Sequence, residues 1–312
     1  MLLLAGLMVA LVGAAKYRHT TKFPSHCRLV GMYVYPVKGL QGYAVTSARL
    51  LERGLEHDRR FMIVDSVKAN SFCTQREYAD MARIECRIVC NSEGEDVLEL
   101  RRGERSIQIS QWTLAEKARV KVRVWSSHCE QAVDQGQLVA DWLAGELPSE
   151  SAEFRLVYMP DECERQCDSS GGVDSQVSFA DGYPYLIANT ESLEDLNQKI
   201  VQAGGEAVPM ERFRPNLVVS GLPAWSEDRV GATLQLTNGT KLQIVSLCDR
   251  CKVTTIDQST GRISPQGEPL QTLKTFRRVQ YNTKVFFAIN AVRISGGSVG
   301  EVTNQPVELQ WK

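Results

Sequence analysis

The chain has 312 residues, of which 43% are hydrophobic and 23% charged, with a formal net charge of −1 at pH 7. This length is enough for two average domains or one large one, and the composition is that of a globular protein. Because the chain is nearly neutral and carries neither a basic block nor an RNA-binding aromatic motif, nucleic-acid binding is excluded as a working hypothesis.

The amino terminus, residues 1–15, is an uncharged apolar run, followed by Lys16, Arg18 and Lys22. As a helix it would reach about 22 Å, short of a hydrocarbon core of about 30 Å. A secretory signal would need a positive n-region, and a matrix presequence would be amphipathic and Arg-rich. We therefore expect residues 1–20 to form a short membrane anchor with a basic flank. Basic residues after the span predict that the bulk of the protein faces the cytosol.

Residues 25–150 are predicted to form an amino-terminal β-domain, because short β-branched and aromatic runs alternate with turns. Strands are expected over 27–37, 43–51, 59–65 and 118–125, a hairpin over 82–102, and a helix over 137–147. A boundary is expected at 148–153, where the pattern breaks.

Residues 151–312 are predicted to form a second, strand-rich domain with peripheral helices, which makes the fold class α+β. After a strand at 154–159 comes a long polar segment, 160–184. Thr190 is expected to cap a helix over 190–204, and 212–216 to lead into a strand. A hairpin is expected over 232–247 with Asn238-Gly239 as its two-residue turn, then a helix over 268–278 and closing strands over 284–294 and 306–311.

The nine cysteines are odd in number and scattered, unlike a disulfide-stapled scaffold. Cys86 and Cys90 alternate with apolar residues, as buried strand thiols do. The first seven cysteines are therefore interpreted as reduced and structural, which indicates a reducing compartment.

Cys248 and Cys251 form a Cys-Asp-Arg-Cys pair at the end of the predicted hairpin. A structural zinc site would need two more ligands, which Cys163 and Cys167 could supply. A thioredoxin-like pair would begin a helix, whereas the following Val-Thr-Thr-Ile run is interpreted as a strand. Metal or cofactor ligation, inert thiols and redox chemistry all stay open at this point.

Three groups of basic residues stand at predicted strand ends: Lys38, the pair Arg59-Arg60, and Arg214 in Arg-Pro-Asn. Each alone is ordinary surface charge. Together they offer a point charge and planar forks suited to a phosphate or a heterocycle edge, while a thiolate suits a soft metal.

The segments YPVKGL (35–40), DRRFMIVD (58–65), FRPNLVVSG (213–221) and CDRCKVTTIDQSTG (248–261) occur in the order found in the MOSC superfamily of molybdenum-cofactor proteins. With its β-rich amino-terminal half and apolar leader, the chain most resembles the animal mitochondrial amidoxime-reducing components within that superfamily. The resemblance implies an amino-terminal MOSC-type β-domain packed on a β-barrel-like MOSC domain.

The resemblance also implies roles for particular residues. Cys251 would supply the thiolate that binds molybdenum, and Lys38 and Arg60 would hold the phosphate of the pterin. Arg214, Asn216 and Arg250 would contact the cofactor, while Asp181 would act on the substrate side or support the metal site. Cys248 would be a structural thiol. Two positions depart from the family pattern: Gly39, where relatives often carry a small hydroxyl residue, and Ala288, where a glycine is expected.

The implied activity is two-electron cleavage of N–O bonds in N-hydroxylated compounds, namely amidoximes, hydroxylamines and N-oxides, and also nitrite. Because no nicotinamide or flavin fingerprint is visible, electrons would arrive from cytochrome b5 and NADH-cytochrome b5 reductase. The implied location is the mitochondrial outer membrane. Two alternatives stay open: a molybdenum-cofactor or sulfur carrier, and a non-enzymatic membrane-anchored binding protein stapled by zinc.

Overall fold

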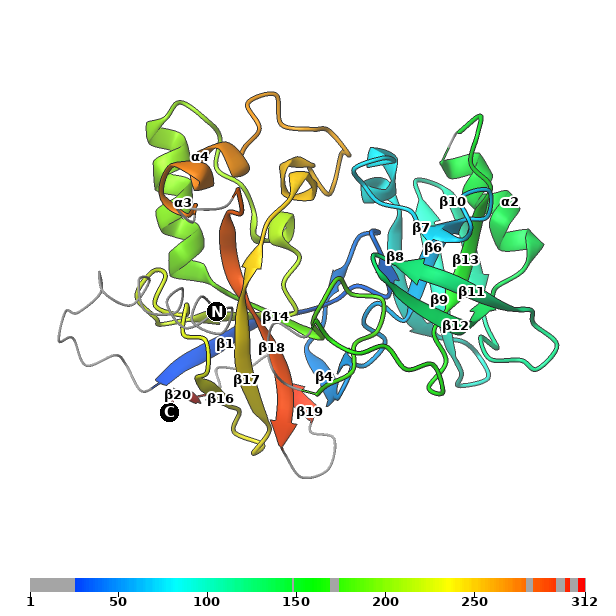
Figure 1. Cartoon of the computed structure of the whole chain (residues 1–312), viewed down its shortest axis with the longest axis horizontal. Helices are drawn as coiled ribbons and strands as arrows, with labels where there is room; N and C mark the ends of the chain where they lie inside the picture. The colour runs from blue at the N-terminus through cyan, green and yellow to red at the C-terminus, as the bar shows by residue number, and fades with distance from the viewer. Residues whose placement is uncertain are drawn as a thin grey trace, which may run out of the picture.

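The computed structural model describes residues 26–147, 149–168, 174–278, 283–295, 301–303 and 308–311. Two strand-rich bodies lie side by side in Figure 1, with helices α3 and α4 on one body and α2 on the other. The predicted strand-rich α+β fold with peripheral helices is confirmed.

The strands are β1 His26–Val34, β2 Val37–Lys38, β3 Tyr43–Ala44, β4 Ser47–Leu51, β5 Gly54–Leu55, β6 Phe61–Asp65, β7 Ser71–Phe72, β8 Glu85–Cys90, β9 Asp96–Arg102, β10 Arg105–Ile109, β11 Arg119–Val124, β12 Ser127–Asp134, β13 Phe154–Tyr158, β14 Tyr185–Asn189, β15 Leu217–Ser220, β16 Thr233–Gln235, β17 Lys241–Asp249, β18 Phe286–Ser295, β19 Glu301–Thr303 and β20 Glu308–Trp311. The helices are α2 Gln137–Glu146, α3 Thr190–Gln202 and α4 Leu270–Phe276.

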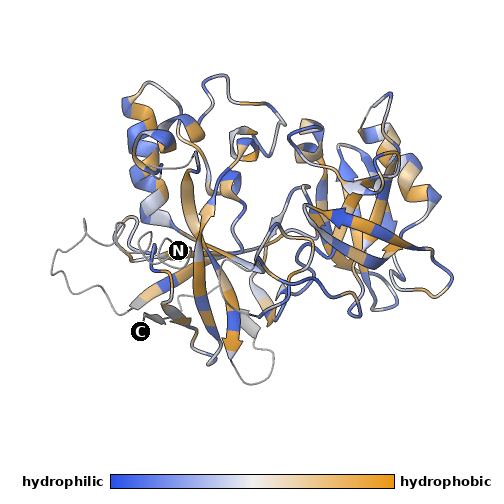
Figure 2. Ribbon diagram, in the orientation of Figure 1, coloured by the Kyte–Doolittle hydropathy of each residue, from blue (hydrophilic) through white to orange (hydrophobic). Residues whose placement is uncertain are grey.

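The first body is a closed barrel with the strand order β15-β14-β18-β17-β16-β20-β1, which the antiparallel pairing of β1 with β15 completes. Its interior is filled by buried aliphatic side chains, among them Leu29, Ile187 and Ile289. Figure 2 shows the apolar positions recurring along these strands. Helices α3 and α4 cover part of the outside through a second cluster that includes Leu196 and Phe287.

The second body is a smaller closed barrel, β13-β12-β11-β7-β6, completed by the pairing of β13 with β6. Strand β6 is buried throughout because its alternate residues enter two different apolar clusters. Phe61 and Ile63 face a cluster shared with helix α2, whereas Met62 and Val64 face the cluster of β11 and β12.

The chain crosses between the two bodies. Strands β1 and β3 belong to the first sheet although they precede the second barrel in sequence, and β13 closes the second barrel from beyond residue 150. The division into domains at 150/151 stays a prediction.

Several local expectations differ from the structure. The run after the cysteine pair is a 3-10 helix, Lys252–Thr255, so the predicted strand there is wrong. The hairpin of β16 and β17 is confirmed, but Leu236 pairs with Thr240, which leaves a three-residue turn in place of two. Gly239 takes a φ of 85° at the last turn position, as such turns require.

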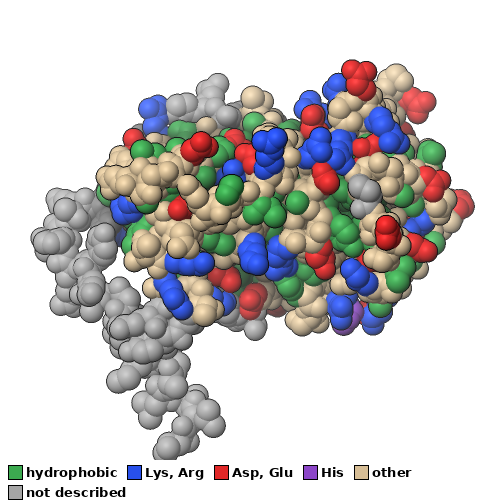
Figure 3. Space-filling model, turned by 90° about the horizontal axis from the view of Figure 1, so that it is seen from above, with side chains coloured by type: hydrophobic (Ala, Val, Ile, Leu, Met, Phe, Trp, Pro, Cys, Tyr) green, Lys and Arg blue, Asp and Glu red, His purple; other side chains and the backbone are tan. Residues whose placement is uncertain are grey.

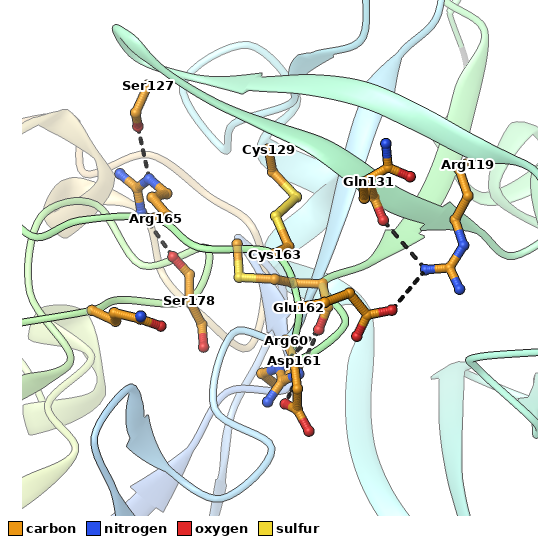
Figure 4. The surroundings of a disulfide bond; sticks show 12 residues. Arg60, Arg119, Ser127, Cys129, Gln131, Asp161, Glu162, Cys163, Arg165 and Ser178 are labelled. Atoms are coloured by element: carbon orange, nitrogen blue, oxygen red, sulfur yellow. Dashed lines mark hydrogen bonds and ion pairs between the residues drawn. A yellow bond between two sulfur atoms is a disulfide. The ribbon is translucent and has the colours of Figure 1, made fainter.

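The cysteine prediction is wrong for three residues. Cys129 on β12 and Cys163 form a disulfide, drawn in Figure 4, so the first seven cysteines are not all reduced. Cys90 is exposed at the end of β8, while Cys86 is buried as expected. Sequence spacing could not reveal the disulfide, because its partners are 34 residues apart.

The predicted anchor, residues 1–20, lies outside the described residues. Among the residues that are described, no helix has the length and apolar character needed to cross a membrane.

Helix α3 is capped by Asn189, one residue before the expected Thr190. The Asn189 side chain accepts a hydrogen bond from the Glu191 amide at 3.3 Å and donates to the buried Glu227 carboxylate at 3.1 Å. One side chain therefore satisfies both a helix end and a buried acid.

Replacing Asn189 with alanine is expected to lower the free energy of unfolding by about 2 kcal/mol, because the helix loses its cap and Glu227 loses a buried donor. Urea unfolding of the variant beside wild type measures this. Gln198→Ala, an exposed position on the same helix, is the matched control and should change stability by less than about 0.5 kcal/mol. Equal stability of the two variants would contradict the assigned role of Asn189.

Candidate functional site

A cavity of about 530 Å³ lies where the two barrels meet, and residues of both line it. Its cationic lining residues are Lys38, Arg59, Arg76, Arg212, Arg214, Arg250 and Lys284, against the carboxylates Asp168, Asp181 and Asp249. Its thiols are Cys73, Cys248 and Cys251. A larger, shallow hollow along α3 is lined by one carboxylate and by no cation or thiol. The cavity between the barrels is therefore the candidate site.

Lys38 and Asp181 form an ion pair across the cavity. Lys38 ends β2 and is only 8% exposed, and its Nζ lies 2.5 Å from Asp181 Oδ1. The Trp125 indole Nε1 donates to the same oxygen at 3.0 Å. Partial desolvation by the cavity wall favours a higher pKa for the Asp181 carboxyl, but the Lys38 charge and these two donors lower the pKa well below its ordinary value. Asp181 is therefore ionised at neutral pH, with 71% of its side chain still exposed in the cavity.

Arg59 lies in the cavity, whereas Arg60 does not. Arg59 is 9% exposed and pairs with the buried Asp58 at 2.7 Å. Arg60 turns away and donates to Tyr158 Oη at 3.2 Å and to Asp161 at 2.8 Å, as Figure 4 shows for Asp161. The structure thus does not bring the predicted Arg60 to the site and brings its neighbour instead.

Arg214 and Asn216 both line the cavity, as the sequence predicted. Arg59 and Arg214 stack on the Tyr35 ring, with guanidinium carbons 4.1 and 4.5 Å from the ring centroid. Burial and the nearby Arg59 charge lower the pKa of Arg214 to about 10, so it remains a cation at neutral pH. Asn216 is 2% exposed and holds the Leu186 amide and the Tyr33 carbonyl, which joins β14 to β1.

The three thiols differ in exposure. Cys73 is buried, which raises its pKa to about 12 and keeps it protonated. Cys248 is partly buried and accepts a hydrogen bond from Arg250 Nη1 at 2.8 Å; burial raises its pKa despite this cation. Cys251, by contrast, is exposed at the start of the 3-10 helix. Cys251 is therefore the thiol that a ligand in the cavity can reach.

The cavity wall contains cationic N–H groups with no partner among the described residues. These are Nε and Nη1 of Arg212 and Nε of Arg250, all buried. An unpaired buried donor is costly, so such groups indicate an acceptor that binds there. On the molecular face in Figure 3, by contrast, basic and acidic side chains are interspersed.

The zinc site proposed from sequence is not formed. Cys163 is bonded to Cys129, and no three His, Cys, Asp or Glu side chains within the described ranges gather as metal ligands would.

Several site residues were missed by sequence reasoning. The sequence prediction gave the phosphate role to Arg60, whereas Arg59 lines the cavity. Trp125 was predicted only as the end of a strand. Gln258 accepts from Arg214 at 3.1 Å and from Gln75 at 2.9 Å, which links the second barrel to the Arg-Pro-Asn loop. The one sequence feature that pointed to Gln258 was its position within the motif CDRCKVTTIDQSTG (248–261).

The two departures from the family pattern have physical consequences. Gly39 has a φ of 84°, and a Cβ there would lie 2.8 Å from Met81 Cε, so a larger residue would need that methyl to move. Ala288 has a φ of 67°, the left-handed conformation that glycine adopts without cost. The glycine expected at 288 thus matches the backbone, and alanine adopts it at a cost of about 1 kcal/mol.

Asp257 organises the loop after the cysteine pair. Its Oδ1 accepts from the amides and hydroxyls of Ser259 and Thr260, and its Oδ2 accepts from Arg212 at 3.1 Å. Burial opposes ionisation, but these hydrogen bonds prevail and lower the pKa of Asp257 from 3.8 to about 2.

Because this pKa is depressed in the folded state, the carboxylate stabilises the protein above pH 4 and loses that effect as the pH falls towards 2. Asp257→Asn should therefore unfold more easily than wild type at pH 7, and the difference should shrink between about pH 4 and about pH 2. Urea unfolding at several pH values measures both. A difference independent of pH would contradict the assignment.

Comparison with known proteins places this geometry in a family. Residues 26–150 match the MOSC N-terminal beta barrel domain, and residues 174–303 match the MOSC domain. Mitochondrial amidoxime-reducing component 1 of Mus musculus is 30% identical over 254 residues, which cover 79% of this chain and 70% of that protein. The Homo sapiens protein of the same name is 29% identical over 88% of this chain and 80% of its own length.

A second type of relative is longer. Molybdenum cofactor sulfurase of Arabidopsis thaliana is 25% identical over 92% of this chain, but the match spans only 36% of that protein. The two domain matches agree with the paired barrels of the structure, and the shorter relatives match 79% and 88% of this chain. The chain belongs to the MOSC-domain family, and it joins a MOSC N-terminal β-barrel domain to a MOSC domain.

Proposed function

We propose that this protein is a molybdenum-cofactor-dependent reductase of N-hydroxylated compounds: amidoximes, hydroxylamines and N-oxides, and also nitrite. The observation that carries the proposal is one cavity in which an exposed thiol, Cys251, stands among an excess of cationic side chains. Relatives named amidoxime-reducing components, at about the length of this chain, support it.

The residues present fit such a cofactor. A thiolate is a soft ligand suited to molybdenum, and Cys251 is the exposed thiol of the cavity. Lys38, Arg214 and Arg250 provide charge for a phosphate, and the unpaired N–H groups of Arg212 and Arg250 provide donors without acceptors. Asn216 would contact the cofactor, and Arg59 takes the place first assigned to Arg60. When bound, the cofactor supplies exchange of two electrons and one oxygen atom.

Asp181 is placed to act on the substrate side. Its carboxylate is held by Lys38 and Trp125 through one oxygen, Oδ1, while much of the side chain stays exposed. Since it stays ionised at neutral pH, it can accept a hydrogen bond from the N–H or O–H of an N-hydroxylated group. Its role is to orient that group, not to deliver a proton, because a carboxyl with so low a pKa is ionised at neutral pH and carries no proton to give.

The proposal extends to partners and location. Electrons would come from cytochrome b5 and NADH-cytochrome b5 reductase, and the amino-terminal anchor would hold the protein on the mitochondrial outer membrane, facing the cytosol. The amidoxime-reducing components named above carry the word mitochondrial in their names, which supports the organelle.

A carrier of molybdenum cofactor or sulfur is the second candidate, favoured by the likeness to the sulfurases. A carrier would bind the cofactor through the same cavity but would not turn over an N-hydroxylated substrate. Turnover by loaded protein therefore separates the two candidates.

Cys251→Ala, expressed in a host that makes the cofactor, is expected to lose molybdenum or all reductase activity while remaining folded. Elemental analysis, circular dichroism and reduction of benzamidoxime with a chemical electron donor measure these three properties. Cys90→Ser, an exposed thiol that does not line the cavity, is the control and should keep both metal and activity. Zinc in place of molybdenum would refute the proposal. Bound molybdenum without turnover of the substrate would instead support the second candidate, the cofactor or sulfur carrier.

Arg59→Ala should lower the molybdenum content by about ten-fold or more, because it removes a buried cation of the cavity. Arg60→Ala is its matched control: the same residue type, adjacent in sequence, with its guanidinium on Tyr158 and Asp161. Elemental analysis of both folded variants gives the answer. If Arg60→Ala loses the metal and Arg59→Ala keeps it, our assignment of Arg59 is wrong.

A further inference from the structure

Two aromatic side chains, Phe72 and Trp125, form one corner of the cavity. Phe72 ends β7 and Trp125 follows β11, and both line the cavity from the second barrel, whereas Cys248 and Cys251 come from the first. The two rings meet edge to face, with centroids 4.9 Å apart and planes at 68°. The rest of the cavity lining is rich in charged residues, so the Phe72 and Trp125 rings offer a surface on which an apolar ring of a ligand can pack.

Trp125 keeps 47% of its surface exposed, although it lines a cavity. The Arg76 guanidinium lies 4.8 Å from its ring centroid, and Lys38 Nζ lies 5.0 Å from that of Phe72. Cations against ring faces are favourable contacts that hold such rings in place. A large apolar ring left half-exposed there has surface available for a ligand.

The backbone at Trp125 is unusual for its residue type. Val124 pairs with Ser127, so Trp125 is the first residue of a two-residue turn, and its φ is 54°. Glycine is the favoured residue for this conformation, and a bulky aromatic residue adopts it at a cost. Glycine would adopt this turn conformation at a lower cost, which indicates a role for the tryptophan ring other than folding.

The turn is fixed to Asp181 on both sides. Trp125 Nε1 donates to the Asp181 carboxylate at 3.0 Å. Ser127, at the other end of the turn, accepts from Arg165 Nε at 2.8 Å, and Arg165 Nη2 donates to the Asp181 carbonyl at 2.6 Å. Figure 4 shows Arg165 between Ser127 and Ser178. These hydrogen bonds therefore fix the position of the Trp125 ring relative to the Asp181 carboxylate.

We propose that Trp125 is the specificity-determining residue of the cavity: its ring, with Phe72, forms the surface on which a flat aromatic substituent of an N-hydroxylated substrate lies. Asp181 then receives the polar head of the same substrate. This inference rests on the proposed reductase function for its substrate class. It predicts preference for aryl over alkyl substrates of the same functional group.

The test compares benzamidoxime with acetamidoxime, which share the reacting group and differ in a phenyl or methyl substituent. In wild type, kcat/KM should favour the phenyl compound. Trp125→Ala should reduce the phenyl-to-methyl ratio of kcat/KM by about three- to ten-fold, mainly through KM. Trp125→Phe keeps a ring but loses the N–H, so it should restore most of that ratio. Leu138→Ala, 74% exposed on α2, is the control and should match wild type.

A second measurement separates this inference from the function on which it rests. Calorimetry with molybdenum-loaded protein and no electron donor measures binding of the same two compounds without turnover. Phenyl-selective binding that Trp125→Ala loses and Trp125→Phe retains supports the aromatic surface, even if no variant reduces either compound. Turnover by every variant with an unchanged phenyl-to-methyl ratio and unchanged binding would overturn the inference and leave the reductase standing.

Discussion

Burial of positive charge between two β-barrels is the constraint on which this site depends. Lys38 and Arg59 are each less than a tenth exposed, and each has a carboxylate within 2.7 Å. Without Asp181 and Asp58, the cost of desolvating these cations would fall on the pairing of the two barrels. The buried Nε and Nη1 groups of Arg212 and the buried Nε of Arg250 have no such acceptor among the described residues. The charges of Lys38 and Arg59 are thus neutralised by carboxylates of the protein, whereas Arg212 and Arg250 have N–H groups that a bound anion could satisfy.

The barrels are joined by more than charge. Gln258, from the loop after the cysteine pair, accepts from Gln75, and its carbonyl accepts from Gln41 at 2.7 Å. Gln41 precedes the second barrel in the sequence, and Gln75 is part of the second body. Since β1 closes the first barrel together with β14 to β18 and β20, the strands of the first barrel lie on both sides of the second barrel in the sequence. The cavity walls therefore form only when the whole chain has folded.

Much of the fold could be predicted from sequence, because strand alternation and turn residues are local signals. The β8–β9 and β16–β17 hairpins and helices α2, α3 and α4 were predicted for that reason. The errors came from features that local patterns do not encode. The Val-Thr-Thr-Ile run has strong β propensity, yet Thr254 and Thr255 turn their hydroxyls back to carbonyls three residues earlier and form a 3-10 helix. Arg59 and Arg60 are equivalent in sequence, and only packing decides which faces the cavity. Trp125 was invisible as a site residue because its partner, Asp181, lies 56 residues away.

The pairing of β1 with β20 brings the two ends of the described chain together, with His26 opposite Gln310. Both strands sit at one seam of the larger barrel, as Figure 1 shows. A short linker could therefore join the ends, and new ends could be opened at an exposed turn such as Asn91–Glu95, giving a circular permutant with the same contacts. The contacts of this fold therefore do not require the present order of its strands along the chain.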